Sequence, residues 1–276
     1  MRRLVVVLTD GLRPDAVSPG IMPSLYALGR AFTVAHHART VRPSTTVPAL
    51  ASLATGVGPR THRFLEPGLA FLSGLGALRP VAWELARSGI STEVVAAGLG
   101  RAALPVAWTL ASAVGVRLLV AAGAGARHAA GQARDLLDRG KERLYFVYLP
   151  DCDRAGHAHG WMSQQYLHAA AQVDSGIGRL TTGTDDTVFI VTADHGGGGV
   201  SATEHHEPHP ANDRIPLVVA GPGVSRHRQV TRPVSLLDVP ATILWWFGIA
   251  VPECYEGRPL AEAFARIPGP AATAAT

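Results

Sequence analysis

The chain has little of what several classes of protein require. Its 276 residues include only two cysteines, Cys152 and Cys254, which lie far apart in the sequence. So few cysteines exclude a disulfide framework, and the absence of a CxxC pair excludes the zinc motifs built on it. This cysteine use is typical of a reducing compartment, and we expect a cytoplasmic protein.

Charge and long apolar runs are scarce too. Charged residues make up 17% of the chain and its arginines are scattered singly, so we expect no nucleic-acid-binding surface. The first apolar run stops at Asp10 without a small-residue cleavage site, which disfavours a signal peptide. The longest apolar region, 106–126, is interrupted by Gly115 and Arg117. We interpret it as a helix, a turn and a strand rather than a membrane span, and we expect no membrane association.

What the chain does have is a regular alternation of segments typical of strands and helices. Residues 4–8 form a continuous aliphatic run, as in a parallel strand buried on both faces. Residues 46–55 are expected to be helical, with Pro48 in the first turn and Gly56 just past the end. The sequence therefore predicts a single α/β domain over residues 1–267, with a mostly parallel central sheet sandwiched between helices.

Acidic and imidazole side chains follow three of the expected strands. Asp10 ends the first strand, Asp153 and His157 follow a later one, and Asp194 and His195 close another. Carboxylate and imidazole groups at strand ends are what a divalent metal site in an α/β enzyme needs. Two such sets suggest two metal ions.

Thr46 lies at the start of the helix expected over residues 46–55. The partial positive charge of a helix N-terminus favours an alkoxide and an incoming anionic group. Free threonine is a poor nucleophile, but it becomes a good one when a divalent cation holds its oxygen. Taken alone, the position of Thr46 favours a simple helix cap.

The surrounding residues add a family resemblance. The segment 46–56, Thr-Val-Pro-Ala-Leu-Ala-Ser-Leu-Ala-Thr-Gly, resembles the nucleophile segment of the alkaline phosphatase superfamily, and most of all its type I phosphodiesterase/nucleotide pyrophosphatase branch. Sulfatases of this superfamily carry Cys or Ser in place of Thr46 and Arg in place of Leu50, which disfavours a sulfatase. The resemblance extends over residues 5–260. It implies a two-metal hydrolase of phosphate esters, of phosphodiester or nucleotide pyrophosphate type, with a phosphothreonine intermediate.

The resemblance also implies seven ligand side chains shared between two cations: Asp10, Thr46, Asp194 and His195 for one, and Asp153, His157 and His205 for the other. Zinc suits this set, with manganese or iron as alternatives. Three histidines compete for the last position. The spacing to Pro216 favours His205, while His206, His209 and Arg13 are candidates for supporting the ligands or contacting the substrate.

Two features depart from the family pattern. Ala49 stands where these pyrophosphatases carry Asn, and the chain is short, so residues 57–125 are expected to form a reduced cap region. Residues 268–276 are expected to be a flexible tail. We expect a small-molecule phosphate ester or nucleotide as substrate. The alternatives are a phosphomonoesterase or phosphonate hydrolase of the same superfamily, and a non-catalytic metal-binding relative.

Overall fold

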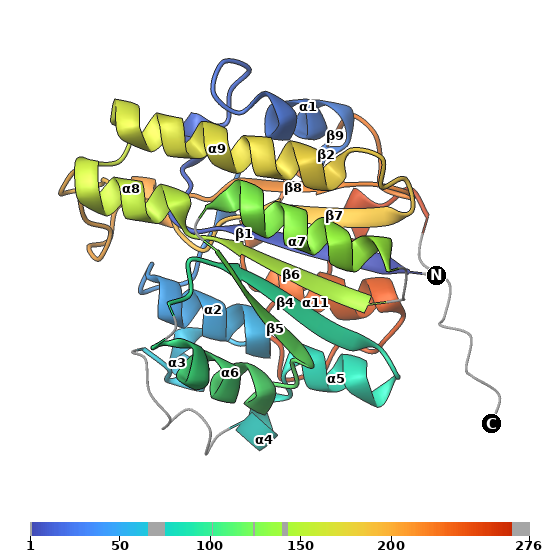
Figure 1. Ribbon diagram of the computed structural model, residues 1–276. Helices are drawn as coiled ribbons and strands as arrows, with labels where there is room; N and C mark the ends of the chain where they lie inside the picture. Colours follow the sequence, from blue (N-terminus) through green and yellow to red (C-terminus); the bar gives the residue numbers. More distant parts are fainter. Residues whose placement is uncertain (1, 66–74, 101, 124, 140–142, 267–276) are drawn as a thin grey trace.

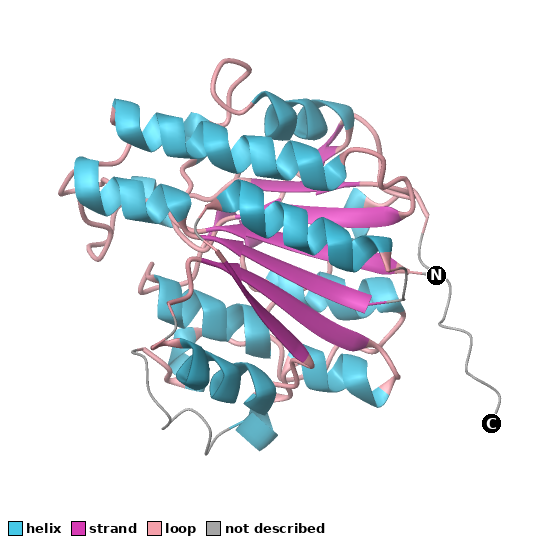
Figure 2. Cartoon of the chain, in the orientation of Figure 1, coloured by secondary structure: helices cyan, strands magenta, loops and turns pink. Residues whose placement is uncertain are grey.

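The computed structural model describes residues 2–65, 75–100, 102–123, 125–139 and 143–266. In this part of the chain, eight strands form one mostly parallel sheet that lies between helices (Figures 1 and 2). The α/β class and the sandwiched, mostly parallel sheet expected from the sequence are confirmed. The expected tail, 268–276, lies outside the described residues, as do residues 66–74 of the expected cap region.

The strands follow the order β5-β4-β6-β1-β7-β8-β2-β9 across the sheet. Among these described strands, β8 alone runs opposite to the others, because it pairs antiparallel with both β7 and β2. A separate two-stranded sheet joins β3 (Ala38–Arg39) and β10 (Val234–Ser235). The main sheet contains β1 (Arg3–Thr9), β2 (Thr33–Val34), β4 (Ser91–Ala97), β5 (Leu118–Ala122), β6 (Arg143–Leu149), β7 (Thr187–Thr192), β8 (Leu217–Ala220) and β9 (Arg228–Gln229).

The central strand, β1, is buried on both faces. Its residues Leu4 to Leu8 have no exposed surface, and it runs parallel to β6 on one side and β7 on the other. Figure 1 shows α7 (Ala126–Asp138) and α9 (Gln164–Thr181) in front of the sheet and α11 (Asp238–Phe247) behind it. This double covering explains why the sequence of β1 is continuously aliphatic instead of alternating.

The remaining helices complete the two layers and the loops at the edges of the sheet. Helices α2 (Thr46–Thr55) and α5 (Val81–Arg87) pack against α11, and α1 (Pro23–Ala31) packs against α9. Among the described residues, no helix is both long and apolar enough to cross a bilayer. The other bounds are α3 (Pro59–His62), α4 (Leu75–Leu78), α6 (Leu104–Ala113), α8 (Asp151–His159), α10 (Pro210–Asp213), η1 (Pro14–Ala16) and η3 (Ala261–Ala263).

Helix α2 begins and ends where the sequence predicts. It starts at Thr46, and Gly56 ends it in the left-handed conformation with φ of 73°. A Cβ atom at Gly56 would lie 2.3 Å from the ring of Tyr255, so no larger residue fits there. These local signals fix the bounds of the helix and place Thr46, which is half-buried, in its first turn.

Candidate active site

The candidate ligands gather at the carboxyl edge of three adjacent strands. Asp10 directly follows β1, Asp194 and His195 follow β7, and Asp153 lies on α8, just after β6. Because β6, β1 and β7 are parallel neighbours, their carboxyl ends meet at one edge of the sheet. The backbone reinforces this arrangement, since the N–H of Asp153 donates to the carbonyl oxygen of Asp10 at 3.0 Å.

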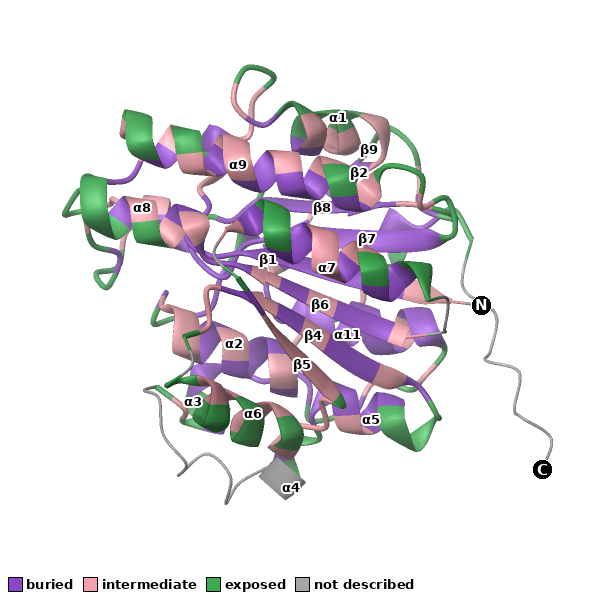
Figure 3. Ribbon diagram, in the orientation of Figure 1, coloured by how far each residue is buried: buried purple, intermediate pink, exposed green. Residues whose placement is uncertain are grey.

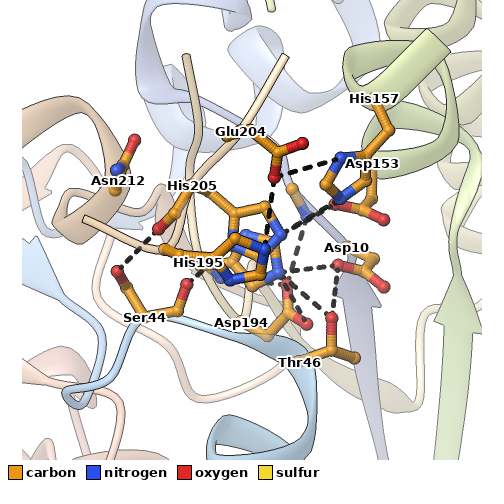
Figure 4. Close-up of polar contacts among 12 residues, drawn as sticks. Asp10, Ser44, Thr46, Asp153, His157, Asp194, His195, Glu204, His205 and Asn212 are labelled. Atoms are coloured by element: carbon orange, nitrogen blue, oxygen red, sulfur yellow. Dashed lines mark hydrogen bonds and ion pairs between the residues drawn. The ribbon is translucent and has the colours of Figure 1, made fainter. Parts of the chain in front are cut away.

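One cluster surrounds the hydroxyl of Thr46 (Figure 4). The Thr46 Oγ1 atom lies 3.2 Å from His195 Nε2 and 3.5 Å from Asp10 Oδ1. His195 Nε2 in turn lies 3.2 Å from Asp10 Oδ1 and 3.7 Å from Asp194 Oδ2. The structure thus brings together the four side chains that the resemblance assigns to one cation.

A second cluster lies beside the first and contains Asp153, His157 and His205. The Nε2 atoms of the two histidines are 3.2 Å apart, and they lie 3.5 Å and 3.7 Å from Asp153 Oδ1. The rings of His195 and His205 stack with centroids 3.9 Å apart, which joins the two clusters. Ligand atoms of Asp153, His195 and His205, and those of Asp10, Asp194 and His195, converge closely enough to hold metal ions.

Backbone carbonyl groups orient all three imidazole rings. The Nδ1 atoms of His157, His195 and His205 lie 2.9, 2.7 and 2.9 Å from the carbonyl oxygens of Thr203, Gly196 and Ser44, respectively. In each neutral ring Nδ1 therefore carries the hydrogen, and Nε2 presents a lone pair toward the clusters. Metal-binding histidines are held in this way, with the second nitrogen donating to a carbonyl or carboxylate oxygen.

The clusters concentrate negative charge in a buried region. Burial and the Asp10 carboxylate raise the pKa of Asp153 to about 6, and the same two causes raise the pKa of Asp194 well above its ordinary value. Burial opposes charging of His195, but the Asp194 and Asp10 carboxylates outweigh it and raise the pKa of His195 to about 10. Burial and the His195 charge lower the pKa of His205 to about 3. Without cations, the carboxylates need protons to balance their charge.

Two carboxylate oxygens in the clusters also lack a hydrogen bond. Asp153 Oδ1 and Asp194 Oδ2 are buried, and neither has a hydrogen-bond partner. An unpaired buried carboxylate oxygen is costly unless a cation or a donor satisfies it. Together with the converging Nε2 atoms, this donor set fits divalent cations bound at both clusters.

The other candidates from the sequence lie around the clusters. The side chain of His206 is 64% exposed and its Nε2 atom lies 3.2 Å from Glu204, while His209 Nδ1 accepts the N–H of Ala211 and caps α10. Arg13 pairs with Asp15 and donates to the carbonyl oxygen of Gly197 at 3.4 Å. Of the three histidines in the His-rich segment, His205 is the one that reaches the clusters.

Several supporting residues were missed by the reasoning from sequence. Tyr148, the penultimate residue of β6, donates its hydroxyl hydrogen to Asp10 Oδ2. Trp161 and Tyr166 both donate to the carbonyl oxygen of Gly11, at 2.8 and 2.9 Å. A polar aromatic residue at the carboxyl end of a strand beside a ligand was the available signal for Tyr148, whereas Trp161 and Tyr166 lie in segments without such a signal.

The fold is that of the alkaline phosphatase superfamily. The chain superposes on a superfamily protein from Vibrio parahaemolyticus with a TM-score of 0.72 and 21% identity, covering 96% of this chain and 71% of that one. A phosphonate monoester hydrolase from Silicibacter pomeroyi gives a TM-score of 0.68 at 18% identity, covering 100% and 78%. The sequence profile of the type I phosphodiesterase / nucleotide pyrophosphatase family matches residues 4–66 and 106–229, and the chain belongs to this family.

Curated relatives share part of the sequence. GPI ethanolamine phosphate transferase 1 of Aspergillus fumigatus is 39% identical over 88 residues, which are 30% of this chain and 8% of that protein. Its counterpart from Saccharomyces cerevisiae is 35% identical over 98 residues, which are 33% of this chain and 10% of the relative. The matched segments thus span a tenth or less of the length of these two relatives.

Proposed function

We propose that this protein is a metal-dependent hydrolase of phosphate esters, of the phosphodiester or nucleotide pyrophosphate type, with Thr46 as its nucleophile. The observation that carries the proposal is the position of the Thr46 hydroxyl. It lies at the N-terminus of α2, 3.2 Å from His195 Nε2 and 3.5 Å from Asp10 Oδ1. The family to which the chain belongs supports the same chemistry.

In this proposal the two clusters hold two divalent cations. Asp10, Thr46, Asp194 and His195 would hold one, and Asp153, His157 and His205 would hold the other. Bound there, such cations would neutralise the phosphoryl oxygens and lower the pKa of the Thr46 hydroxyl. Three imidazoles and three carboxylates suit zinc, and manganese or iron also accept these ligands.

The residues of the chain position the reacting groups. The positive end of the α2 dipole, where the N-cap residue Thr45 makes no side-chain capping bond, favours a phosphate next to Thr46. Thr46 Oγ1 attacks phosphorus, the bond to the leaving oxygen breaks, and the phosphoryl group is transferred to Thr46. Water then cleaves the phosphothreonine, which restores the hydroxyl and releases the product phosphate.

The test is Thr46→Ala, assayed with bis-p-nitrophenyl phosphate, p-nitrophenyl phosphate and phosphonoacetate. We expect diester turnover to fall by about a thousand-fold or more, because the nucleophile is lost. Bound metal and the circular dichroism spectrum should stay as in the wild type. Thr45→Ala, one residue earlier, is the matched control and should keep its turnover. Full activity of Thr46→Ala would show that Thr46 is not the nucleophile. A preference of the wild-type protein for the monoester or the phosphonate would make it a phosphomonoesterase or a phosphonate hydrolase instead.

Transfer to an alcohol is a second candidate, favoured by the sequence likeness to the ethanolamine phosphate transferases. It differs from hydrolysis only in the acceptor that attacks the phosphothreonine, an alcohol instead of water. Phosphorus NMR of reactions containing glycerol would separate the two. A glyceryl ester as the main product would indicate a transferase, and free phosphate monoester a hydrolase.

A further inference from the structure

A cavity of about 350 Å³ lies between α2, α6 and one face of the sheet. It is partly open to solvent. In Figure 1, α6 lies beside α2, next to the edge of the sheet that β5 and β4 form. The helices α2 and α6 and the strands β4 and β6 contribute to its wall: Leu50 and Ala54 from α2, Leu110 and Ala111 from α6, Val94 from β4 and Phe146 from β6.

The wall of this cavity is almost entirely apolar. Among the described residues that line it, Thr92 is the one polar side chain, and none carries a charge. A nucleotide base, a sugar or a charged group would lose its hydrogen bonds to water there without replacing them. A hydrocarbon chain loses nothing polar and gains from leaving water, so the cavity is suited to a hydrocarbon.

Helix α6 supports this assignment. Its sequence, LPVAWTLASA, is apolar, yet no residue in it is buried (Figure 3). One side borders the cavity through Leu110 and Ala111, and the other side leaves Val106 and Trp108 about half exposed. An apolar surface helix normally buries one face against the core. Here that face meets the cavity, which an apolar occupant would fill.

The cavity adjoins the proposed nucleophile through α2. Val47, which follows Thr46 directly, lines the cavity, and so do four residues from the later turns of the helix, namely Leu50, Ala51, Leu53 and Ala54. An apolar cavity of about 150 Å³ holds one benzene molecule, so about 350 Å³ corresponds to roughly fourteen carbon atoms. We propose that the substrate is a phosphate ester of a long-chain alcohol, with its phosphate at Thr46 and its hydrocarbon chain in this cavity. This inference rests on the proposed function.

The test uses p-nitrophenyl phosphodiesters whose second ester group is ethyl, hexyl or decyl, at concentrations below micelle formation. Each buried methylene contributes about 0.8 kcal/mol, or roughly four-fold. We expect kcat/KM to rise by about two- to four-fold per methylene across the whole series, because even the decyl chain is short enough for the cavity. Equal values for the ethyl and decyl esters would overturn the inference.

Two substitutions on α6 test whether the dependence of kcat/KM on chain length comes from this cavity. Ala111→Phe places a ring inside the cavity and should lower the decyl-to-ethyl ratio of kcat/KM by about ten-fold or more. Val106→Phe introduces the same ring on the half-exposed side of the same helix, and it should keep the wild-type ratio. An unchanged ratio in Ala111→Phe would mean that another part of the protein fills the cavity, or that it stays empty, and either result rejects the inference.

A binding measurement separates this inference from the proposed function. Calorimetry with Thr46→Ala protein should show that dodecyl phosphate binds at least a hundred-fold more tightly than ethyl phosphate, and that Ala111→Phe removes the difference. If the ethyl diester is not hydrolysed in a Thr46-dependent way, the proposed function fails. The calorimetry then still shows whether the cavity binds a hydrocarbon chain. If the ethyl diester is hydrolysed but dodecyl phosphate and ethyl phosphate bind equally tightly, the proposed function stands and the assignment of the cavity to a hydrocarbon chain is wrong.

Discussion

Tyr148 donates its phenolic hydrogen to Asp10 Oδ2, so the opposite carboxylate oxygen, Oδ1, is left to face His195 Nε2 at 3.2 Å. Burial and the Asp10 charge raise the pKa of Tyr148, so its hydroxyl remains protonated and able to donate. The strand register places Tyr148 beside Leu8, two residues before Asp10. A residue of β6 thus sets the orientation of the candidate ligand that follows β1.

Tyr148→Phe tests this relationship. The substitution keeps the ring and removes the donor, so Asp10 gains freedom to rotate while the fold persists. We expect metal affinity or turnover to fall by about ten- to a hundred-fold, as is usual when a partner of a metal ligand is lost. Metal titration and diester kinetics measure the effect. Tyr26→Phe, at an exposed position, is the control, and a loss of the same size in both variants would argue against the role of Tyr148.

Gly11, in the loop after β1, lies against Asp153 in the first turn of α8. Its φ is 67°, and a Cβ atom there would lie 2.8 Å from the Cα and 2.9 Å from the Cβ of Asp153. Gly11→Ala should therefore displace Asp153 and lower the free energy of unfolding by about 1–3 kcal/mol. Urea unfolding and metal titration measure both effects. Gly20→Ala meets no atom within 4 Å and should change neither quantity. Wild-type metal affinity in Gly11→Ala would show that Asp153 tolerates the shift.

Metal binding should stabilise the folded chain. At a free metal concentration a thousand times the dissociation constant, one site contributes about 4 kcal/mol, so we expect chelation to lower Tm by roughly 10 °C. His205→Ala should lose the part of this shift that comes from the cluster of Asp153, His157 and His205, because the ring is buried and its Nε2 lies 3.7 Å from Asp153 Oδ1. His206→Ala should keep it, since that side chain is 64% exposed. Thermal scans with and without chelator measure the shift in each variant. If His206→Ala lost the shift and His205→Ala kept it, His206 would be the ligand.

The elements that the sequence predicted well are those with local signals. The aliphatic run of β1 and the Pro48 and Gly56 pattern of α2 depend only on neighbours in the chain, and the bounds of α2 agree to the residue. The direction of β8 was not predictable, because Leu217–Ala220 is equally aliphatic in either orientation. The two-residue strand β2 carries no pattern of its own and forms because Thr33 and Val34 lie against β8.

In the candidate site, too, the residues with a local sequence signal could be predicted and the contacts between distant residues could not. Asp10, Asp194 and His195 could be proposed because each follows a recognisable strand, and the Asp153 to His157 spacing suits one helical turn. The contacts that orient them connect distant positions. Trp161 reaches Gly11 across 150 residues, and Tyr148 reaches Asp10 across 138. No local pattern encodes such pairs, so they required the fold.

The pH dependence of stability should report on His62, which lies on α3 away from the clusters. Its ring is buried, its Nδ1 accepts the N–H of Phe64 at 2.9 Å, and its Nε2–H donates to Ser52 Oγ at 3.0 Å. The ring is therefore bound in its neutral form. Burial lowers the pKa of His62 below its ordinary value of 6.5, with Pro48 and Glu256 acting in the opposite direction.

The direction in which His62 changes stability with pH follows from proton uptake by the folded and unfolded chains. Above pH 6.5 the ring is neutral in both states, and its contribution to stability is complete. As the pH falls from 6.5 toward the lower pKa of the folded state, the unfolded chain binds a proton that the folded chain does not, so stability is lost. His62→Asn should be less stable at pH 7.5 by about 1–2 kcal/mol, because its hydrogen bonds are disturbed.

The decisive quantity is the slope of unfolding free energy against pH between 7.5 and 5, from urea titrations. It should be shallower in His62→Asn than in the wild type, while His37→Asn, at an exposed position, keeps the wild-type slope. Titrations in the ligand clusters are common to all three proteins and cancel in the comparison. A slope in His62→Asn equal to that of the wild type would mean that His62 binds its proton equally in the folded and unfolded states.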